Sequence, residues 1–92
     1  MARTEIYFKA WCPYSRHALA LLTRKGVAFE AIDLTRDAGD RGREMRERSG
    51  RTTVPQIFIG GRHIGGFDDL AALDRSGELD RLLFDEHIAS VA

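Results

Sequence analysis

The segment VPQIFIGGRHIGGFDDL, residues 54–70, contains two short β runs, two glycine pairs and the start of a helix in direct succession. The first run, residues 56–59, is mostly β-branched and aromatic, and Gly-Gly separates it from the second run, residues 62–64. Two glycines between such runs are typical of a tight β-hairpin. After the second glycine pair, Asp68 and Asp69 favour a helix start, because carboxylates stabilise the positive end of a helix. The segment therefore predicts an antiparallel strand pair followed directly by a helix.

The N-terminal part of the chain predicts a strand–helix–strand unit. Residues 6–8 form an apolar β run, and Pro13 fits the first turn of a helix, where its missing N–H is not needed. Apolar residues continue at helical spacing until Gly26, which is a favourable C-terminal stop. The apolar stretch at residues 27–34 then predicts a second strand. The crossover between the two parallel strands should be right-handed.

The segment at residues 36–50 is polar, with one large apolar residue, Met45. Opposite charges four residues apart support a helix by pairing on its surface. We therefore expect a short exposed helix here. The expected pairs are Arg43 with Glu47, Glu44 with Arg48, and Glu47 with Arg51.

At the C-terminal end, Ser76-Gly77 separates the helix that follows the hairpin from a last helix with a stripe of leucines. The complete order is β-α-β-α-β-β-α-α. It predicts an α/β fold, in which a four-stranded mixed sheet is flanked by helices on both faces. We expect residues 1–92 to form a single domain.

The composition narrows the class of protein. The 92 residues include 14 basic and 14 acidic side chains, so the formal net charge of zero gives no sign of nucleic-acid or membrane-surface binding. One cysteine cannot form an internal disulfide, which argues against a secreted disulfide framework. No stretch resembles a signal peptide or a membrane helix, and a reducing cytoplasm is the expected location.

The single cysteine, Cys12, stands between a predicted strand and the proline that opens a helix. This order places its sulfur at the helix N-cap, where the backbone N–H groups of Tyr14 and Ser15 can point at it. The helix dipole also favours a thiolate, and Lys9 could add positive charge nearby. We expect a reactive, partly exposed thiolate, whereas a lone cysteine without this context is usually a small buried apolar residue.

Cysteine hydrolase chemistry would need a histidine as general base beside the thiol. His17 follows five positions later on the same helix and should point away from the cap. We expect His63 in a hairpin strand and His87 in the last helix, each as a surface or packing residue. The His and Cys residues show no metal-ligand spacing, and neither glycine pair matches a phosphate loop. We therefore expect no metal site built by this chain alone.

Three motifs together resemble the glutaredoxin family of the thioredoxin fold. They are WCPYS at residues 11–15, RTTVPQIFI at 51–59 and HIGGFDDL at 63–70, in the family's order. The resemblance implies glutathione as co-substrate and Cys12 as nucleophile. The glutathione-binding residues that it implies are Lys9, Tyr14, Thr53, Val54, Pro55, Gly66, Phe67 and Asp68.

The resemblance also implies how these residues act. Pro55 should follow a cis peptide bond, and the backbone of Val54 should pair with the cysteinyl part of glutathione. The turn at Phe67 and Asp68 should hold the γ-glutamyl end, and Lys9 should lie near the glycine carboxylate.

Ser15 departs from the family's Cys-Pro-Tyr-Cys pattern, because it stands where the resolving cysteine would be. Cys12 alone can still reduce protein–glutathione mixed disulfides, with a second glutathione completing the cycle. Dithiol reduction of protein disulfides should be impaired. Phe67 is a second departure, because members of the family often carry a small residue or a cysteine at this position. It should have little effect, since the implied contact with glutathione there is made by the backbone. The sequence is compatible with Ser15 as a natural monothiol variant or as an introduced replacement.

Two alternatives remain. In the first, two copies of the chain bridge a [2Fe–2S] cluster, each giving Cys12, with two glutathiones as the other ligands. Pro13 argues against it, because cluster binders more often show Cys-Gly-Phe-Ser. In the second, the chain is a redox-inert binding domain on the same scaffold. The enzyme interpretation expects a monomer whose partners are glutathione and glutathionylated proteins, with no nucleic acid and no membrane.

Overall fold

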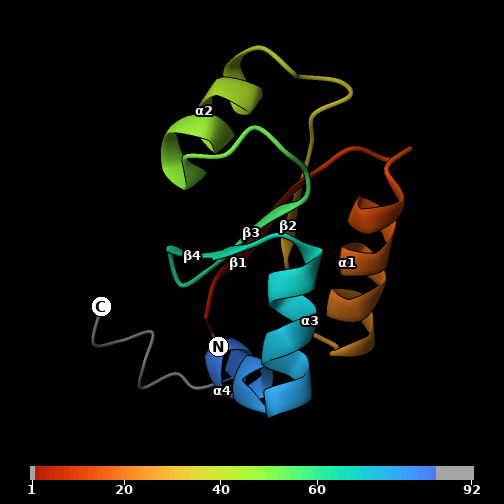
Figure 1. Ribbon diagram of the computed structural model, residues 1–92, viewed down its shortest axis with the longest axis vertical. Helices are drawn as coiled ribbons and strands as arrows, with labels where there is room; N and C mark the ends of the chain where they lie inside the picture. Colours follow the sequence, from red (N-terminus) through yellow and green to blue (C-terminus); the bar gives the residue numbers. More distant parts are fainter. Residues whose placement is uncertain (1, 85–92) are drawn as a thin grey trace.

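The computed structural model describes residues 2–84, and its centre is a four-stranded sheet in the order β2-β1-β3-β4 (Figure 1). β1 runs parallel to β2 and antiparallel to β3, and β3 and β4 form the antiparallel hairpin. The strands are β1 (Thr4–Phe8), β2 (Glu30–Asp33), β3 (Gln56–Ile59) and β4 (Arg62–Gly65). The helices are α1 (Pro13–Arg24), α2 (Asp40–Ser49), α3 (Phe67–Ser76) and α4 (Glu78–Phe84). The predicted element order and mixed sheet are confirmed.

The second strand is shorter than predicted. β2 begins only at Glu30, because its parallel partner β1 offers it just the positions from Glu5 to Phe8. Val27 and Phe29 still face the core, and they lie in the loop before the strand. The apolar pattern therefore identified buried residues correctly, but it could not show where pairing with β1 begins.

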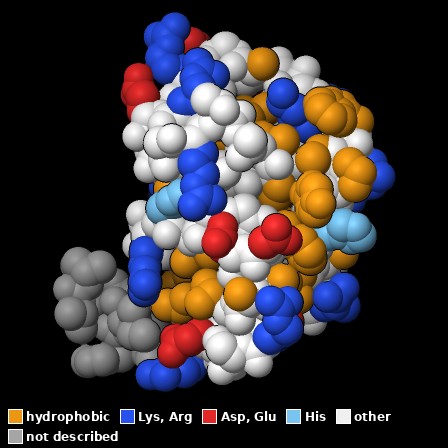
Figure 2. All heavy atoms as spheres, viewed as in Figure 1, with side chains coloured by type: hydrophobic (Ala, Val, Ile, Leu, Met, Phe, Trp, Pro, Cys, Tyr) orange, Lys and Arg blue, Asp and Glu red, His pale blue; other side chains and the backbone are white. Residues whose placement is uncertain are grey.

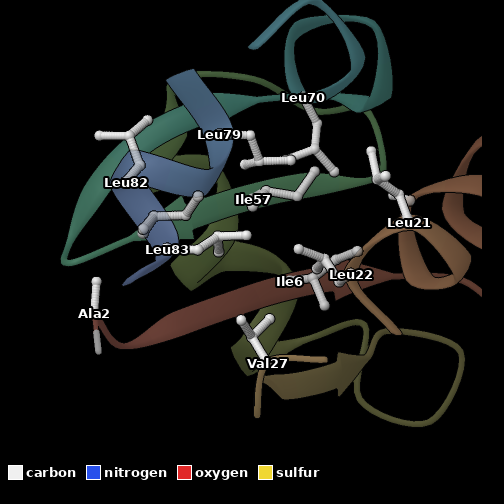
Figure 3. Close-up of a cluster of buried hydrophobic side chains, with 12 residues drawn as sticks. Ala2, Ile6, Leu21, Leu22, Val27, Ile57, Leu70, Leu79, Leu82 and Leu83 are labelled. Atoms are coloured by element: carbon white, nitrogen blue, oxygen red, sulfur yellow. The ribbon is translucent and has the colours of Figure 1, made fainter. Parts of the chain in front are cut away.

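The two faces of the sheet bury separate groups of side chains. Consecutive residues of a strand point to opposite faces, and in β1 Ile6 faces α1, α3 and α4 while Tyr7 faces α2. The first group gathers leucines of the three helices around Ile6 and Ile57 (Figure 3). On the other face, Met45 of α2 packs with Tyr7. Helices on both faces were predicted, and this is confirmed.

A network of charged side chains joins α2 to the sheet. Arg48 donates two hydrogen bonds of 3.1 Å to the carboxylate of Glu5 and one of 2.8 Å to the hydroxyl of Tyr7. Its guanidinium also lies 3.9 Å from the ring centroid of Phe58, a distance suited to a cation–π contact. The Tyr7 hydroxyl in turn donates to Glu44.

The prediction of three ion pairs along α2 is wrong: none of the three forms among residues 2–84. Glu44 pairs with Arg41 at 3.3 Å, and Arg48 and Arg51 pair with carboxylates outside the helix. The reason is that α2 lies against the sheet, where the largely buried Glu5 offers a partner that helical spacing does not reveal.

The hairpin leads into α3 through Gly65, whose φ of 122° is rare for residues with a side chain. A Cβ atom at this position would lie 2.2 Å from Oδ2 of Asp69. Asp69 uses the same oxygen to accept the N–H of Gly66 at 3.0 Å, which caps the start of α3. Only glycine allows the chain to turn so closely onto the helix that it enters.

None of the helices within residues 2–84 has the length and apolar character needed to cross a membrane. His87 lies outside the described residues.

Replacing Arg48 by Met should lower the free energy of unfolding by about 2 kcal/mol, because it leaves the Glu5 carboxylate without its charged partner. The Glu5 side chain is only 10% exposed, so water cannot fully replace the arginine. Urea denaturation of the two variants measures the difference. Arg43→Met, on the exposed side of the same helix, should change it by less than about 0.5 kcal/mol. Equal losses in both variants would contradict the role given to Arg48.

Gly65→Ala should destabilise the fold more than Gly61→Ala does. Both glycines have positive φ, so each alanine should cost about 1–2 kcal/mol of backbone strain. Only at Gly65 does the new Cβ collide with Asp69, since nothing lies within 4 Å of a Cβ at Gly61. Thermal unfolding of both variants tests this, and the same loss at the two positions would argue against the clash.

Candidate active site

Cys12 lies in the short connection between β1 and α1, as the sequence predicts. Its backbone is extended at the N-cap of α1 (φ −81°, ψ 121°), and Pro13 occupies the first turn. The Cys12 N–H donates to the carbonyl of Lys9 at 3.0 Å, and its carbonyl accepts the N–H of Arg16 at 3.0 Å. These two bonds fix the cysteine between strand and helix, with its side chain at the helix end.

The surroundings of Cys12 lower the pKa of its thiol. Burial acts to raise this pKa, since the residue is only 9% exposed, but hydrogen bonds and charge outweigh burial. The backbone N–H and hydroxyl of Ser15, the N–H of Tyr14 and the guanidinium of Arg16 all lower it below the usual 9.0. Because these groups stabilise negative charge at a helix N-terminus, they favour the thiolate. The predicted direction of the shift is confirmed, although the thiol is less exposed than predicted.

Ser15 lies beneath the thiol and is fully buried. Its Oγ accepts the backbone N–H of Lys9 at 3.2 Å, so it also joins the end of β1 to α1. The oxygen is thus held by Lys9 while its proton remains available to the sulfur of Cys12, in line with the lowered thiol pKa. A small hydroxyl fits this buried place and satisfies a backbone donor.

The cation that acts on the thiol is Arg16, which the sequence reasoning missed. Its Nη1 donates to the carbonyls of Ala10 at 3.3 Å and Trp11 at 3.1 Å, so the side chain folds back over the active-site loop. Lys9 instead lies with Nζ 5.6 Å from the ring centroid of Trp11. A cation near the positive end of a helix is unfavourable by itself. The position of Arg16 in the first turn of the predicted helix could therefore have indicated a role at the thiol.

A groove of about 310 Å³ opens beside the thiol, between the segment around Val54 and the start of α3. The carbonyl oxygen of Val54 lies 3.9 Å from the Cys12 sulfur, and the peptide bond between Val54 and Pro55 is cis, as the resemblance implies. This volume is near the lower end of the range for small-molecule sites. The predicted residues that line it are Tyr14, Thr53, Val54, Pro55, Gly66, Phe67 and Asp68.

Three further residues line the groove and were not predicted: Arg51, Gln56 and Asp69. Gln56 is buried and donates from Nε2 to the carbonyl and hydroxyl of Thr53, at 3.1 and 3.3 Å. The sequence offered a signal for this role in the groove: Gln56 is an amide at the start of a predicted strand, directly after Pro55. A polar group that a strand buries needs hydrogen-bond partners.

The two adjacent aspartates have different surroundings. Asp69 caps α3 and also pairs with Nη1 of Arg51 at 3.2 Å. Asp68 is exposed on the groove and makes no ion pair or side-chain hydrogen bond with any residue between 2 and 84. The carboxylate available to a ligand is therefore that of Asp68, the one that the resemblance selects.

The described histidines do not contact the thiol. His17 packs its ring against Phe67 with centroids 5.5 Å apart, and Nε2 of His63 lies 2.7 Å from Oε1 of Gln56. Burial and the nearby Arg51 lower the pKa of His63, which favours its neutral form. Both are packing residues, as predicted, and neither is placed as the general base of a cysteine hydrolase.

Apolar side chains surround the entrance to the site. Trp11 is 66% exposed and Tyr14 59% exposed, on either side of Cys12 in the sequence. Figure 2 shows hydrophobic side chains gathered over the N-terminal half of α1, next to a pair of acidic side chains at the centre of the view. Such a patch around a reactive group is typical of an interaction surface.

Another hollow, of about 750 Å³, lies away from the thiol. Its arginines and glutamates pair with one another, through the contacts of Arg3, Arg41 and Arg48. Because the charges of this hollow are already paired, the candidate active site is the groove of about 310 Å³ beside Cys12. The thiol with the lowered pKa lies beside this groove, and the carboxylate of Asp68 lines it.

Comparison with known proteins gives the family. A glutaredoxin family model matches residues 4–64. Glutaredoxin 3 of Escherichia coli (strain K12) is 58% identical over 83 residues, which cover 90% of this chain and 99% of that protein.

Solved structures agree with the sequence match. The holo form of glutaredoxin C1 from Populus tremula x tremuloides has a TM-score of 0.83 at 31% identity, covering 99% of this chain and 81% of that one. A buckwheat glutaredoxin–glutathione complex has a TM-score of 0.82 at 30% identity, covering 91% of this chain and 78% of that one. Because sequence and fold agree over most of its length, the chain belongs to the glutaredoxin family of oxidoreductases.

Proposed function

We propose that this chain uses Cys12 alone to reduce protein–glutathione mixed disulfides at the expense of glutathione. The observation that carries the proposal is the site's single thiol, which has a lowered pKa and lies 3.9 Å from the Val54 carbonyl at the edge of the groove. Its neighbour in the second cysteine position is the buried hydroxyl of Ser15. The chain has no other cysteine.

In the first step, the Cys12 thiolate attacks the glutathione sulfur of the mixed disulfide. The bond between that sulfur and the target protein's sulfur breaks, and the target leaves as a thiolate that takes a proton from water. Cys12 is now joined to glutathione. The groups that stabilise the thiolate also make Cys12 a good leaving group in the next step.

In the second step, the thiolate of another glutathione attacks the glutathione sulfur of this adduct. Oxidised glutathione leaves, and Cys12 returns as a thiolate. Two glutathione sulfurs have become one disulfide, and the target has gained the two electrons as a free thiol. Ser15 cannot attack the adduct, so the cycle contains no intramolecular disulfide.

The groove supports glutathione as the ligand. The exposed Asp68 and the free N–H groups at the start of α3 suit the charged γ-glutamyl end, which carries both an amino group and a carboxylate. Val54 lies between this end and the thiol, where its backbone can pair with the cysteinyl part. The related buckwheat protein is described in complex with glutathione, which agrees with this assignment.

The same chemistry sets the conditions in which the protein works. An unpaired, activated thiol and a supply of reduced glutathione both require a reducing compartment, and we place the protein in the cytoplasm. We propose that it acts as a single-domain monomer on glutathionylated proteins.

The cluster alternative needs only one thiolate from each of two chains, because two glutathiones supply the other ligands. Within residues 2–84, no group of three or more His, Cys, Asp or Glu side chains is arranged to hold a metal ion. This finding does not bear on a cluster that takes only Cys12 from each chain. That alternative stays a prediction of the sequence.

The single-thiol mechanism predicts a separation of two activities. The unaltered chain should release glutathione from a glutathionylated protein and consume added glutathione as it does so, but it should not reduce a protein disulfide when glutathione is absent. Ser15→Cys should gain the second activity, because its new thiol can resolve the mixed disulfide. Cys12→Ser should lose both. Multiple turnovers of a protein disulfide by the unaltered chain without glutathione would refute the mechanism.

The hydroxyl of Ser15 should be measurable in the pKa of Cys12. Ser15→Ala removes a donor to the thiolate, so the pKa should rise. The rate at which iodoacetamide alkylates Cys12, measured across pH, should then be lower in Ser15→Ala than in the unaltered chain at pH values below the thiol pKa. At high pH the two rates should converge, because Cys12 is a thiolate in both proteins. Ser76→Ala, at the far end of α3, serves as the control and should leave the profile unchanged. A profile unaffected by Ser15→Ala would show that the hydroxyl does not act on the sulfur.

A further inference from the structure

A chain of hydrogen bonds runs from β4 to the segment that lines the groove beside the thiol. Nε2 of His63 lies 2.7 Å from Oε1 of Gln56. Nε2 of Gln56 donates in turn to the carbonyl and the hydroxyl of Thr53, at 3.1 and 3.3 Å. Thr53 and Val54 line the groove, whereas His63 is not among its lining residues. A side chain outside the groove is therefore connected to the groove's wall.

The Thr53 carbonyl fixes the direction of every bond in this chain. A carbonyl oxygen can only accept, so the end of the Gln56 amide that faces Thr53 is its nitrogen. The amide oxygen then faces His63, and because this oxygen also only accepts, Nε2 of His63 carries a hydrogen and donates it. Gln56 is 1% exposed, so water cannot take the place of His63 as the donor.

The hairpin brings His63 within reach of Gln56. His63 pairs with Phe58 across β3 and β4, and Gln56 precedes Phe58 by two residues, on the same face of the sheet. Long side chains reach across such a diagonal. The ring of His63 also packs against Phe58, with centroids 5.1 Å apart. His63 thus makes two separable contacts, one through its ring and one through its Nε2 hydrogen.

The held carbonyl of Thr53 sets the direction of the next N–H. The peptide bond between Thr53 and Val54 is trans, and in a trans peptide the C=O and N–H point in opposite directions. Because Gln56 holds the carbonyl, the N–H of Val54 points away from Gln56. Among residues 2–84, no backbone carbonyl accepts this N–H. If the Gln56 amide turned over, its oxygen would face the Thr53 carbonyl, and the peptide would lose this support.

We infer that His63 is a positioning residue for glutathione, because its Nε2 hydrogen orients Gln56 and Gln56 holds the peptide between Thr53 and Val54. This role rests on the proposed function, in which the cysteinyl part of glutathione pairs with the Val54 backbone. It concerns the tripeptide and not the reactivity of the thiol. The groups that lower the pKa of Cys12 lie at the start of α1, apart from this chain of hydrogen bonds.

Two small disulfides test this role, because only one of them carries the tripeptide. Glutathione disulfide offers glutathione to the groove, whereas bis(2-hydroxyethyl) disulfide offers only a bond to be attacked. In each reaction the Cys12 thiolate attacks one sulfur, one thiolate leaves, and the other half remains on Cys12 as a mixed disulfide. Mass spectrometry of the full chain gives the second-order rate constant of this step for each disulfide. The ratio of the two constants measures what the groove contributes.

Two replacements of His63 separate its N–H from its ring. His63→Phe keeps an aromatic ring against Phe58 but removes the donor to Gln56, and it should lower the ratio about fivefold, the effect of one neutral hydrogen bond. Its rate with bis(2-hydroxyethyl) disulfide should stay unchanged. His63→Gln keeps an N–H donor in the place of Nε2 and should keep most of the ratio. In urea, however, His63→Gln should be the less stable variant, because it loses the ring contact with Phe58. A purely structural role would make the ratio and the stability fall together.

A replacement of Gln56 tests the same chain one step closer to the groove. Gln56→Met should lower the ratio at least as much as His63→Phe does. Adding His63→Phe to Gln56→Met should lower it no further, because His63 acts only through Gln56.

The outcomes distinguish this role from the proposed function. An unchanged ratio in His63→Phe or in Gln56→Met, an equal loss in both replacements of His63, or a further loss in the double variant would overturn the role of His63 and leave the proposed function intact. A ratio in the unaltered chain no greater than that of N-acetylcysteine, a thiol without a groove, would instead refute the proposed function, and the role of His63 with it.

Discussion

The hydrogen bonds that join the end of β1 to the start of α1 decide the chemistry of this protein. The Lys9 carbonyl accepts the N–H of Cys12, and the Lys9 N–H donates to the hydroxyl of Ser15. One residue directly after β1, Lys9, therefore holds both the cysteine and the serine beneath it. Because the sulfur is fixed where helix N–H groups and a hydroxyl converge, the negative charge is stabilised despite burial. A thiol displaced by one turn would lose these donors and would be an ordinary buried cysteine.

The two faces of the sheet serve this arrangement in different ways. On one face, α1 is held by an apolar core around Ile6, which fixes the helix end that carries Cys12. On the other, the contact between α2 and the sheet depends as much on charge, since Arg48 reaches Glu5 and lies against Phe58. This orientation of α2 places Arg46, together with Lys9 and Val54, around a hollow of about 90 Å³. Arg48 is paired, and Arg46 has no ion-pair partner among residues 2–84, as a result of the same packing.

Much of the site was readable in the sequence because its parts are local. A cysteine before a proline that opens a helix, a valine before a proline, and a glycine pair before two aspartates each carry their own backbone geometry. The cis form of the Val54–Pro55 bond was implied only by the family resemblance. What was missed acts through space. Arg16 reaches the active-site loop by folding back over it, and Gln56 supports Thr53 from inside the fold. The start of β2 was also misjudged, because pairing with β1 decides it and apolar character does not.

The sequence by itself determined the order of elements, the mixed sheet, the helix-cap thiol and the loss of an internal disulfide through Ser15. Each of these depends on residue type or on short-range spacing. Tertiary structure alone decided which cation acts on the thiol, which aspartate caps α3 and which lies open on the groove, and how deeply Cys12 is buried. These depend on long side chains and on contacts between segments distant in the chain, and such contacts leave no periodic trace in the sequence.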